Sequence, residues 1–424
     1  MLALRSSGAR RPARLPIAIL GRVSNPSSRG AQIAHRSCLA AALLLAALVA
    51  ASCTGTSPPP GQTSASGSSA QASATSSPGT VGSAANTSIG TANGTASASS
   101  IPSQLQVSTV STGLQIPWGL GFLPDGTAVV TERDEATVLA ISPAGAVSEL
   151  GAITGVAPSG EGGLLGVAVS PTFAQDHHLY VYYSGDEENR IATVTLRDGA
   201  LADQRDILTG IPRGSIHNGG RLRFGPDGLL YVGTGETGDR PLAQDLASLG
   251  GKILRLAPDG SPAPGNPFPQ APLVYSYGHR NVQGLAFDSE GRLWASEFGQ
   301  NTWDELNLIQ PGGNYGWPLQ EGHGEETDFV QPQRVWPTSE ASPSGVAVLH
   351  GSVWMACLRG ERLWQIPLSG GGTIDPVPQL AGEYGRLRTV EPAPDGSLWV
   401  TTSNTDGRGQ VRDGDDRILR ITVS

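Results

Sequence analysis

The sequence predicts an all-β fold, a six-bladed β-propeller, because one short pattern recurs six times along it. Each copy has alternating apolar residues, a turn that carries Asp-Gly or a relative, and an apolar-aromatic strand, which is the pattern of a β-hairpin. Strand-like runs such as "TVLAIS", "KILRLA" and "RILRIT" lie between the copies. The copies begin at Gly119, Gly166, Arg221, Gly284, Gly345 and Thr389.

Two hairpin strands and one or two further strands make one blade of a propeller. Six such blades close into a ring that leaves few strand edges exposed. A β-sandwich is the main alternative, but sandwiches do not usually repeat one hairpin pattern six times. No segment of helical periodicity longer than two turns stands out.

Residues 1–53 predict a secretory signal segment. Its first 36 residues contain arginines and no acidic residue, and the uncharged stretch from Cys38 to Cys53 is shorter than the ~20 apolar residues that span a bilayer. The ending "VAASC" resembles the bacterial lipoprotein processing box, which implies cleavage before Cys53 and lipidation of its thiol. A plain secretion signal is the alternative. We therefore expect an extracytoplasmic protein, anchored to the outer face of the cell membrane through a lipid or else secreted.

Residues 54–100 are nearly all Ser, Thr, Gly, Ala and Pro, and they predict a disordered tether because they offer little apolar surface to bury. Residues 101–424 then form the propeller domain. The net charge of −9 argues against a nucleic-acid partner. Within the propeller domain Cys357 is the single cysteine, so no intrachain disulfide is expected there.

Loops beside the hairpins are where a propeller carries its function. His217 precedes the third hairpin, either as a catalytic base or as a structural loop residue. A ligand with several carboxylates or phosphates suits the loop arginines Arg280, Arg359, Arg386 and Arg388, since guanidinium binds oxyanions in bidentate fashion. Surface arginines paired with carboxylates are the alternative. Arg386 and Arg388 are two residues apart, so in an extended chain they point the same way.

Two further segments offer polar groups in glycine-rich surroundings. Residues 296–318 contain Glu297, Asp304, Glu305 and Asn307, hard oxygen ligands that suit Ca²⁺, or they form an ordinary polar loop. Glu161 lies in "SGEGGLLG", where glycines either let the backbone approach a ligand or only make a turn. The sequence contains no Rossmann fingerprint after a strand, no P-loop, no HExxH and no GxSxG elbow.

Four segments in this order, "GEGGLLG", "HNGGRLRFGPDG", "YGHRNVQGLAF" and "DELNLIQPGGNYGWP", resemble the soluble pyrroloquinoline-quinone (PQQ)-dependent sugar dehydrogenases, the glucose/sorbosone or aldose sugar dehydrogenase family. The resemblance covers about residues 105–424 and implies a six-bladed propeller. It implies a quinoprotein oxidoreductase that oxidises the C1 hydroxyl of aldose sugars to lactones and passes electrons to an external acceptor. PQQ and Ca²⁺ are the cofactors that it implies.

Residue by residue, the resemblance implies that His217 is the general base that takes the C1 hydroxyl proton while hydride moves to the quinone C5. Gly299 and Gln300 stand where backbone carbonyls bind the calcium that polarises the quinone, and Glu305 and the Tyr315 carbonyl match a structural calcium site. The cofactor-binding positions that it implies are Glu161, Arg280, Asn281, Leu358, Arg359, Arg386, Leu387 and Arg388.

Three residues depart from the pattern of the family. Glu161 stands where members carry glutamine, Glu236 where some have aspartate near the histidine, and Phe298 where a polar side chain precedes the calcium-binding carbonyls. A carboxylate at Glu161 could repel the carboxylates of the quinone or assist the base. Two alternatives therefore stay open: a cell-surface binding propeller that has lost the quinone, and a calcium-dependent lactonase, against which the loop arginines argue.

Overall fold

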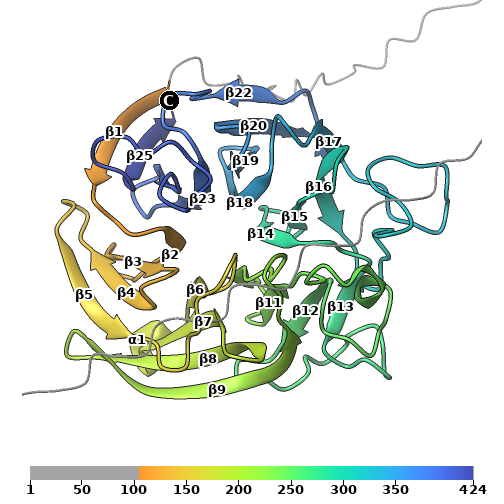
Figure 1. Ribbon diagram of the computed structural model, residues 1–424, viewed down its shortest axis with the longest axis horizontal. Coiled ribbons are helices and arrows are strands. Elements are labelled where there is room, and N and C mark those ends of the chain that lie inside the picture. The colour runs from red at the N-terminus through yellow and green to blue at the C-terminus, as the bar shows by residue number, and fades with distance from the viewer. Residues whose placement is uncertain (1–104, 424) are drawn as a thin grey trace, which may run out of the picture. The chain divides into compact units, whose positions relative to one another are not determined.

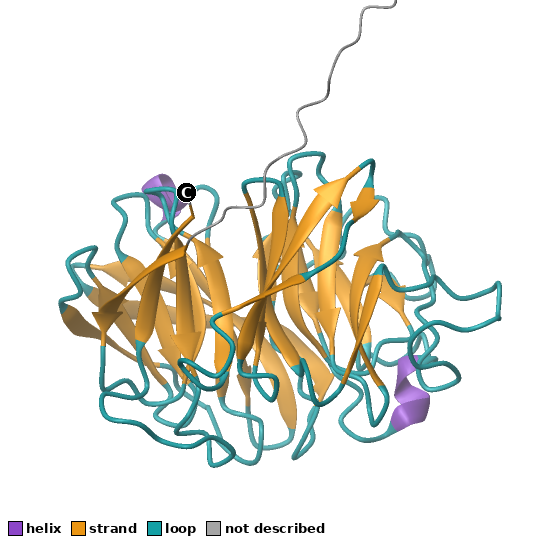
Figure 2. Ribbon diagram, turned by 90° about the horizontal axis from the view of Figure 1, so that it is seen from above, coloured by secondary structure: helices purple, strands orange, loops and turns teal. Residues whose placement is uncertain are grey.

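The computed structural model describes residues 105–423, which form six antiparallel sheets. Viewed down the shortest axis, the sheets stand like blades around a common centre (Figure 1). The side view shows strands that run between two layers of loops (Figure 2). The predicted all-β, six-bladed propeller is therefore confirmed. The predicted signal segment, the lipidation site at Cys53 and the tether lie outside the described residues.

The first three blades are four-stranded sheets whose strands follow in chain order. Blade 1 is β2 (Pro117–Phe122), β3 (Ala128–Glu132), β4 (Thr137–Ile141) and β5 (Val147–Ala152). Blade 2 is β6 (Leu164–Val169), β7 (His178–Ser184), β8 (Glu188–Arg197) and β9 (Ala200–Pro212). Blade 3 is β10 (Leu222–Phe224), β11 (Leu230–Gly233), β12 (Lys252–Leu256) and β13 (Val274–Tyr277).

The last three blades include the closure of the ring. Blade 4 is β14 (Val282–Phe287), β15 (Leu293–Glu297), β16 (Trp303–Ile309) and β17 (Arg334–Pro337). Blade 5 is β18 (Pro343–Leu349), β19 (Ser352–Cys357), β20 (Arg362–Ser369), β21 (Gly372–Thr373) and β22 (Val377–Gln379). Blade 6 is β23 (Leu387–Pro392), β24 (Leu398–Thr402), β25 (Ile418–Val423) and, as its outermost strand, β1 (Leu105–Ser111). Pairing of β1 with β25 thus joins the two ends of the described chain in one sheet.

Helical segments are short in the described part of the chain, namely α1 (Phe173–Asp176) and the 3₁₀ turn η1 (Arg240–Ala243). Within residues 105–423 there is no helix with the length and apolar character needed to cross a bilayer.

Each of the six repeated patterns forms the first two strands of a blade, as the hairpin prediction requires. The Pro-Asp-Gly turns show why the pattern recurs. In the first of them the Asp125 carboxylate accepts the Thr127 N–H at 2.9 Å, and Gly126 has a φ of 86°, which a residue with a side chain rarely adopts. The turn therefore fixes the hairpin register through local chemistry alone.

The core consists of six apolar clusters, each between two neighbouring blades, and these clusters close the ring. Around the centre, the first strands carry polar groups instead. Arg223 of β10 and Glu391 of β23 form a bidentate ion pair at 2.6 and 2.8 Å across the ring. Arg221 donates from Nε to the Gln283 carbonyl at 2.7 Å, and its guanidinium lies 4.5 Å from the ring centroid of Trp118. Guanidinium groups therefore occupy the centre, where the calcium-dependent lactonase alternative would need a cluster of carboxylates and amides around a metal.

Candidate active site

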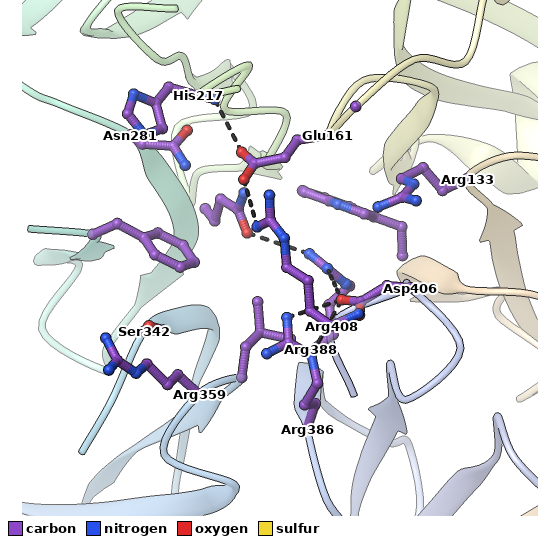
Figure 3. A pocket seen from close by; sticks show the side chains of 15 residues that line it. Arg133, Glu161, His217, Asn281, Ser342, Arg359, Arg386, Arg388, Asp406 and Arg408 are labelled. Carbon is purple, nitrogen blue, oxygen red and sulfur yellow. Dashed lines mark hydrogen bonds and ion pairs between the residues drawn. The ribbon is translucent and has the colours of Figure 1, made fainter. Parts of the chain in front are cut away.

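A cavity of about 390 Å³ opens at one end of the propeller (Figure 3). The residues that line it lie on the first strand of a blade, just before that strand, or just after the second strand. Seven of the predicted site residues line it: Glu161, His217, Asn281, Leu358, Arg359, Arg386 and Arg388. The chain thus brings an imidazole and three of the predicted arginines to one place from blades 2 to 6.

His217 lies in the loop between β9 and β10 with a φ of 54°, in the left-handed region that non-glycine residues seldom adopt. Contacts on both sides hold this backbone: the His217 N–H donates to Glu161 Oε2 at 3.0 Å, and its carbonyl accepts the Thr237 N–H at 3.2 Å. A Cβ at Gly235 would collide with that carbonyl, so glycine is required there. The local backbone is therefore built to present this one side chain.

The imidazole of His217 is oriented by Glu236. Nδ1 lies 3.0 Å from Glu236 Oε1, and the side chain of Glu236 is only 1% exposed, against 12% for that of His217. Because Glu236 engages Nδ1, Nε2 is the nitrogen that remains for a substrate in the cavity.

Asn281 and its neighbours tie this loop to blade 4. Asn281 Oδ1 accepts the Gly219 N–H at 2.9 Å, two residues after His217. The Arg280 carbonyl accepts the Glu236 N–H at 2.9 Å. Displacing the backbone at Arg280 and Asn281 would therefore move both the histidine and the carboxylate that orients it.

Arg386 and Arg388 point to the same side of the chain and share a carboxylate that the sequence did not single out. Asp406 Oδ2 lies 2.9 Å from Arg386 Nη2 and 3.4 Å from Arg388 Nη2. Burial acts to raise the pKa of Asp406, but the two guanidinium groups outweigh it and hold that pKa below its ordinary value. Burial lowers the pKa of Arg388 to about 10, so Arg388 remains cationic at neutral pH.

Glu161, the first departure from the family pattern, is paired. Its Oε1 lies 2.7 Å from Nη1 of Arg408, which projects from the loop between β24 and β25 (Figure 3). Burial acts to raise the pKa of Glu161, but the hydrogen bond from the His217 N–H and the Arg408 guanidinium hold it below its ordinary value. Glu161 is therefore a carboxylate that carries its own counterion.

The lining residues leave a surplus of positive charge. Three positive charges remain when the carboxylates are counted against the guanidinium groups and histidine is counted as neutral. The lining arginines are Arg133, Arg359, Arg386, Arg388 and Arg408, and the lining carboxylates are Glu161 and Asp406. Such a cavity suits a small organic anion with several carboxylates.

Two predicted cofactor-binding side chains do not line the cavity. Arg280 donates from Nη1 to the Phe298 carbonyl at 3.3 Å, and its guanidinium lies 5.4 Å from the ring centroid of Trp317. Leu387 is fully buried in the apolar cluster between blades 5 and 6. Side chains alternate between the faces of a strand, so the register that brings Arg386 and Arg388 to the cavity turns Leu387 into the core.

The predicted metal-binding residues fall in two neighbouring places. Gly299 and Gln300 lie in the turn after β15, next to Phe298, which lines the cavity. Their N–H groups donate to Asp304 at 2.8 Å and to Glu321 at 2.7 Å. This turn is therefore fixed by two carboxylates that accept from its backbone.

Glu305 and Tyr315 lie deeper in blade 4. Glu305 faces Glu297 across strands β15 and β16, and burial together with the charge of Glu297 raises the pKa of Glu305. Among the described residues, Asn307 Oδ1 is buried without a hydrogen-bond partner, while Asn307 Nδ2 donates to Glu305 at 3.0 Å. An orphaned amide oxygen beside buried carboxylates is a donor set that a hard cation would satisfy. No group of three or more His, Cys, Asp or Glu side chains with metal-ligand spacing occurs within residues 105–423, so main-chain oxygens would have to complete the shell.

Several lining residues were not predicted from the sequence, chiefly Trp118, Arg133, Gln283, Ser342, Asp406 and Arg408. Arg133, Asp406 and Arg408 follow the second strand of a repeated hairpin, so the hairpin pattern itself could have indicated them. Trp118 and Gln283 lie on first strands, where the sequence gives no sign that distinguishes a lining side chain from a core one.

Comparison with known proteins agrees with this geometry. The model of the glucose/sorbosone dehydrogenase family matches residues 114–419. The aldose sugar dehydrogenase YliI of Escherichia coli is 31% identical over 342 residues, which cover 72% of this chain and 92% of that protein. A structure described as the PQQ-bound form of the aldose sugar dehydrogenase of Streptomyces coelicolor is 57% identical, with a TM-score of 0.73, and the match covers 76% of this chain and 99% of that one.

A Thermus thermophilus structure described as a putative oxidoreductase (glucose dehydrogenase) is 45% identical, with a TM-score of 0.72 and coverage of 75% of this chain and 100% of that one. The family model covers most of the propeller, from just after β1 into β25. The chain therefore belongs to the glucose/sorbosone dehydrogenase family.

Proposed function

We propose that this protein is a PQQ-dependent aldose sugar dehydrogenase that oxidises the C1 hydroxyl of its sugar and yields the lactone. The observation that supports this most directly is a cavity lined both by an oriented imidazole and by a cluster of arginines with three uncompensated positive charges. PQQ carries three carboxylates, so its charge matches that surplus. A cavity of about 390 Å³ is also within the usual size range for a cofactor-sized ligand.

The arginines are the residues that would hold the quinone. Arg386 and Arg388 are buried and anchored by Asp406, so their positions are set before any ligand arrives. Arg359 has no ion pair or hydrogen bond within residues 105–423, which leaves its guanidinium available to a ligand. When bound, PQQ supplies an electrophilic carbonyl carbon that accepts the hydride from C1 of the sugar.

The protein itself must accept the proton of the C1 hydroxyl. Nε2 of His217 would accept it as the C1–H bond breaks, and Glu236 at Nδ1 would stabilise the imidazolium that forms. Asn281 holds the loop of His217 against blade 4, so the base keeps its position during the reaction.

Ca²⁺ would bind at two places in blade 4. The carbonyls of Gly299 and Gln300 would offer oxygen ligands beside the cavity, where a cation would polarise the quinone. Glu305, Asn307 Oδ1 and the Tyr315 carbonyl would hold a second, structural ion.

We also propose that the protein is extracytoplasmic, held at the outer face of the cell membrane by a lipid on Cys53, and that an external acceptor takes the electrons. This rests on the sequence of residues 1–53. Growth with labelled palmitate, followed by isolation of the protein with and without Cys53→Ala, tests it. Label that is absent from the wild type would make the protein a secreted one.

The enzymatic proposal is tested by reconstituting the purified protein with PQQ and Ca²⁺ and following dye reduction with a panel of aldoses. We expect sugar-dependent reduction that requires the quinone. Saturable quinone binding without turnover on any sugar would contradict the dehydrogenase. No quinone binding at all would favour the alternative of a binding propeller that has lost its cofactor.

A further inference from the structure

The ion pair of Glu161 and Arg408 joins two loops at the cavity, in addition to neutralising the Glu161 carboxylate. Arg408 comes from the last loop of blade 6 and Glu161 from the loop before blade 2, so the pair links two loops that are separated by the whole of blade 1. In Figure 3 the side chain of Arg408 extends over Arg388 toward Glu161. Arg408 thereby lines the cavity.

Arg408 differs from Arg386 and Arg388 in that most of its N–H donors have no partner among the described residues. A guanidinium has five N–H donors, and Arg408 uses only Nη1, for Glu161 Oε1. Arg386 and Arg388, by contrast, are buried and share Asp406. The side chain of Arg408 remains 59% exposed, so a ligand carboxylate can reach its remaining donors without displacing packed residues.

Glu161 is placed to aim Arg408. Its second oxygen, Oε2, is fixed by the His217 N–H at 3.0 Å, so Oε1 has a defined direction. A glutamine at this position would offer only one acceptor oxygen for the His217 N–H and the Arg408 guanidinium together, since its other terminal atom is a donor. The acidic residue therefore suits a site that must hold a histidine backbone and a guanidinium at once.

We propose that Arg408 is a third arginine that binds a carboxylate of the quinone, beside Arg386 and Arg388, and that Glu161 is the residue that positions it. This inference rests on the proposed function and assigns to this pair a role in cofactor affinity. Under this proposal Glu161, which departs from the family pattern, supports anion binding instead of opposing it.

The experiment measures the Kd of PQQ in the presence of Ca²⁺, by absorbance or fluorescence titration, without reference to turnover. The variants are R408Q, E161Q and E161Q/R408Q, with R408K as the conservative replacement. R197Q is the matched control, because Arg197 is an exposed arginine that also pairs with one carboxylate, Asp203, in the β8–β9 turn at the opposite end of the propeller. Thermal unfolding of each variant checks the fold.

We expect R408Q to raise the Kd about 10-fold, as for the loss of a hydrogen-bonded charge pair, and R197Q to leave it unchanged. R408K should recover part of the affinity. The decisive comparison is made without the carboxylate: E161Q/R408Q should still bind more weakly than E161Q, but by less than the loss that R408Q causes in the presence of Glu161, because Arg408 is then no longer aimed.

Three results would overturn the inference, and each has a different meaning. If R408Q weakens binding only while Glu161 is present, and the loss disappears in the E161Q background, Arg408 merely neutralises Glu161. If the wild type shows no saturable PQQ binding under any condition, the proposed function fails and the inference falls with it. Wild-type binding with an unchanged Kd in R408Q would overturn the role of Arg408 alone.

Discussion

Nδ1 of His217 lies 3.0 Å from Oε1 of Glu236, a carboxylate whose side chain is 1% exposed. The second oxygen of Glu236 accepts the N–H of Gly238, so the carboxylate cannot rotate freely. A buried, doubly engaged carboxylate on one nitrogen of a largely buried imidazole leaves the other nitrogen for the cavity. The same arrangement stabilises the imidazolium that proton transfer creates.

Replacing Glu236 by glutamine should lower kcat by at least about 10-fold, because the neutral amide stabilises the imidazolium less. KM for the sugar and Kd for PQQ should change little, since Glu236 does not line the cavity. Steady-state kinetics beside a quinone titration separate the two. A loss that appears only in Kd would show that Glu236 supports the cofactor site instead.

Replacing His217 by asparagine should lower kcat by at least about 10²-fold, the usual cost of losing a general base. Asparagine tolerates the left-handed backbone at this position, so the loop should keep its conformation. Quinone titration and thermal unfolding serve as controls for the site and the fold. A variant with wild-type turnover would remove His217 from the reaction.

Much of this architecture could be predicted because its cause is local. Each repeated hairpin carries its own turn chemistry and alternating apolar residues, so the first two strands of every blade follow from short segments. The outer strands were not predicted. β5 and β9 are half-exposed, with one buried residue in six and one in thirteen, and they lack the apolar alternation that marks a strand. Pairing of β1 with β25 joins the two ends of the described chain, which no local pattern reveals.

The residues of the site likewise divide into those that a local sequence pattern predicts and those that only the folded ring brings together. A spacing of two residues correctly placed Arg386 and Arg388 on one side of the chain, and the same alternation turns Leu387 into the core. Glu161 and Arg408 are 247 residues apart and belong to different blades. From the sequence, Glu161 was expected either to repel the quinone or to assist the base, and only the closed ring shows that Arg408 pairs with it.

Replacing Asp406 by asparagine should destabilise the protein by about 1–3 kcal/mol at neutral pH, because two buried guanidinium groups lose their shared carboxylate. The pKa of Asp406 is depressed below its ordinary value of 3.8 in the folded protein. Its contribution is therefore fully present above pH 3.8 and is lost as the pH falls through the folded pKa. Urea unfolding of both proteins between pH 3 and pH 7 should show the difference shrinking at the acid end. A difference that does not vary with pH would contradict an ionic role.

Removing divalent cations should lower the thermal stability of the protein, and Ca²⁺ should restore it. Oδ1 of Asn307 is buried without a hydrogen-bond partner among the described residues, beside the facing carboxyl groups of Glu297 and Glu305, and a bound cation would satisfy this set of oxygens. In Asn307→Leu the effect of Ca²⁺ on the melting temperature should be smaller, because one ligand is missing. Equal melting temperatures with a chelator and with millimolar Ca²⁺ would exclude a structural calcium in blade 4.

Breaking the ion pair of Arg223 and Glu391 should cost stability without touching the active site. The pair spans the ring from blade 3 to blade 6, with two N–H···O bonds of 2.6 and 2.8 Å and side chains that are largely buried. Glu391→Gln should lower the free energy of unfolding by about 3 kcal/mol, since Arg223 keeps its charge and loses its counter-charge and one of the two carboxylate acceptors. The double variant Arg223→Met, Glu391→Leu should lose less than the sum of Arg223→Met and Glu391→Leu alone, because it leaves no unpaired charge. Neither residue lines the cavity, so Kd for PQQ should stay unchanged. Additive losses of stability in the double-mutant cycle would mean that the two side chains act independently of each other.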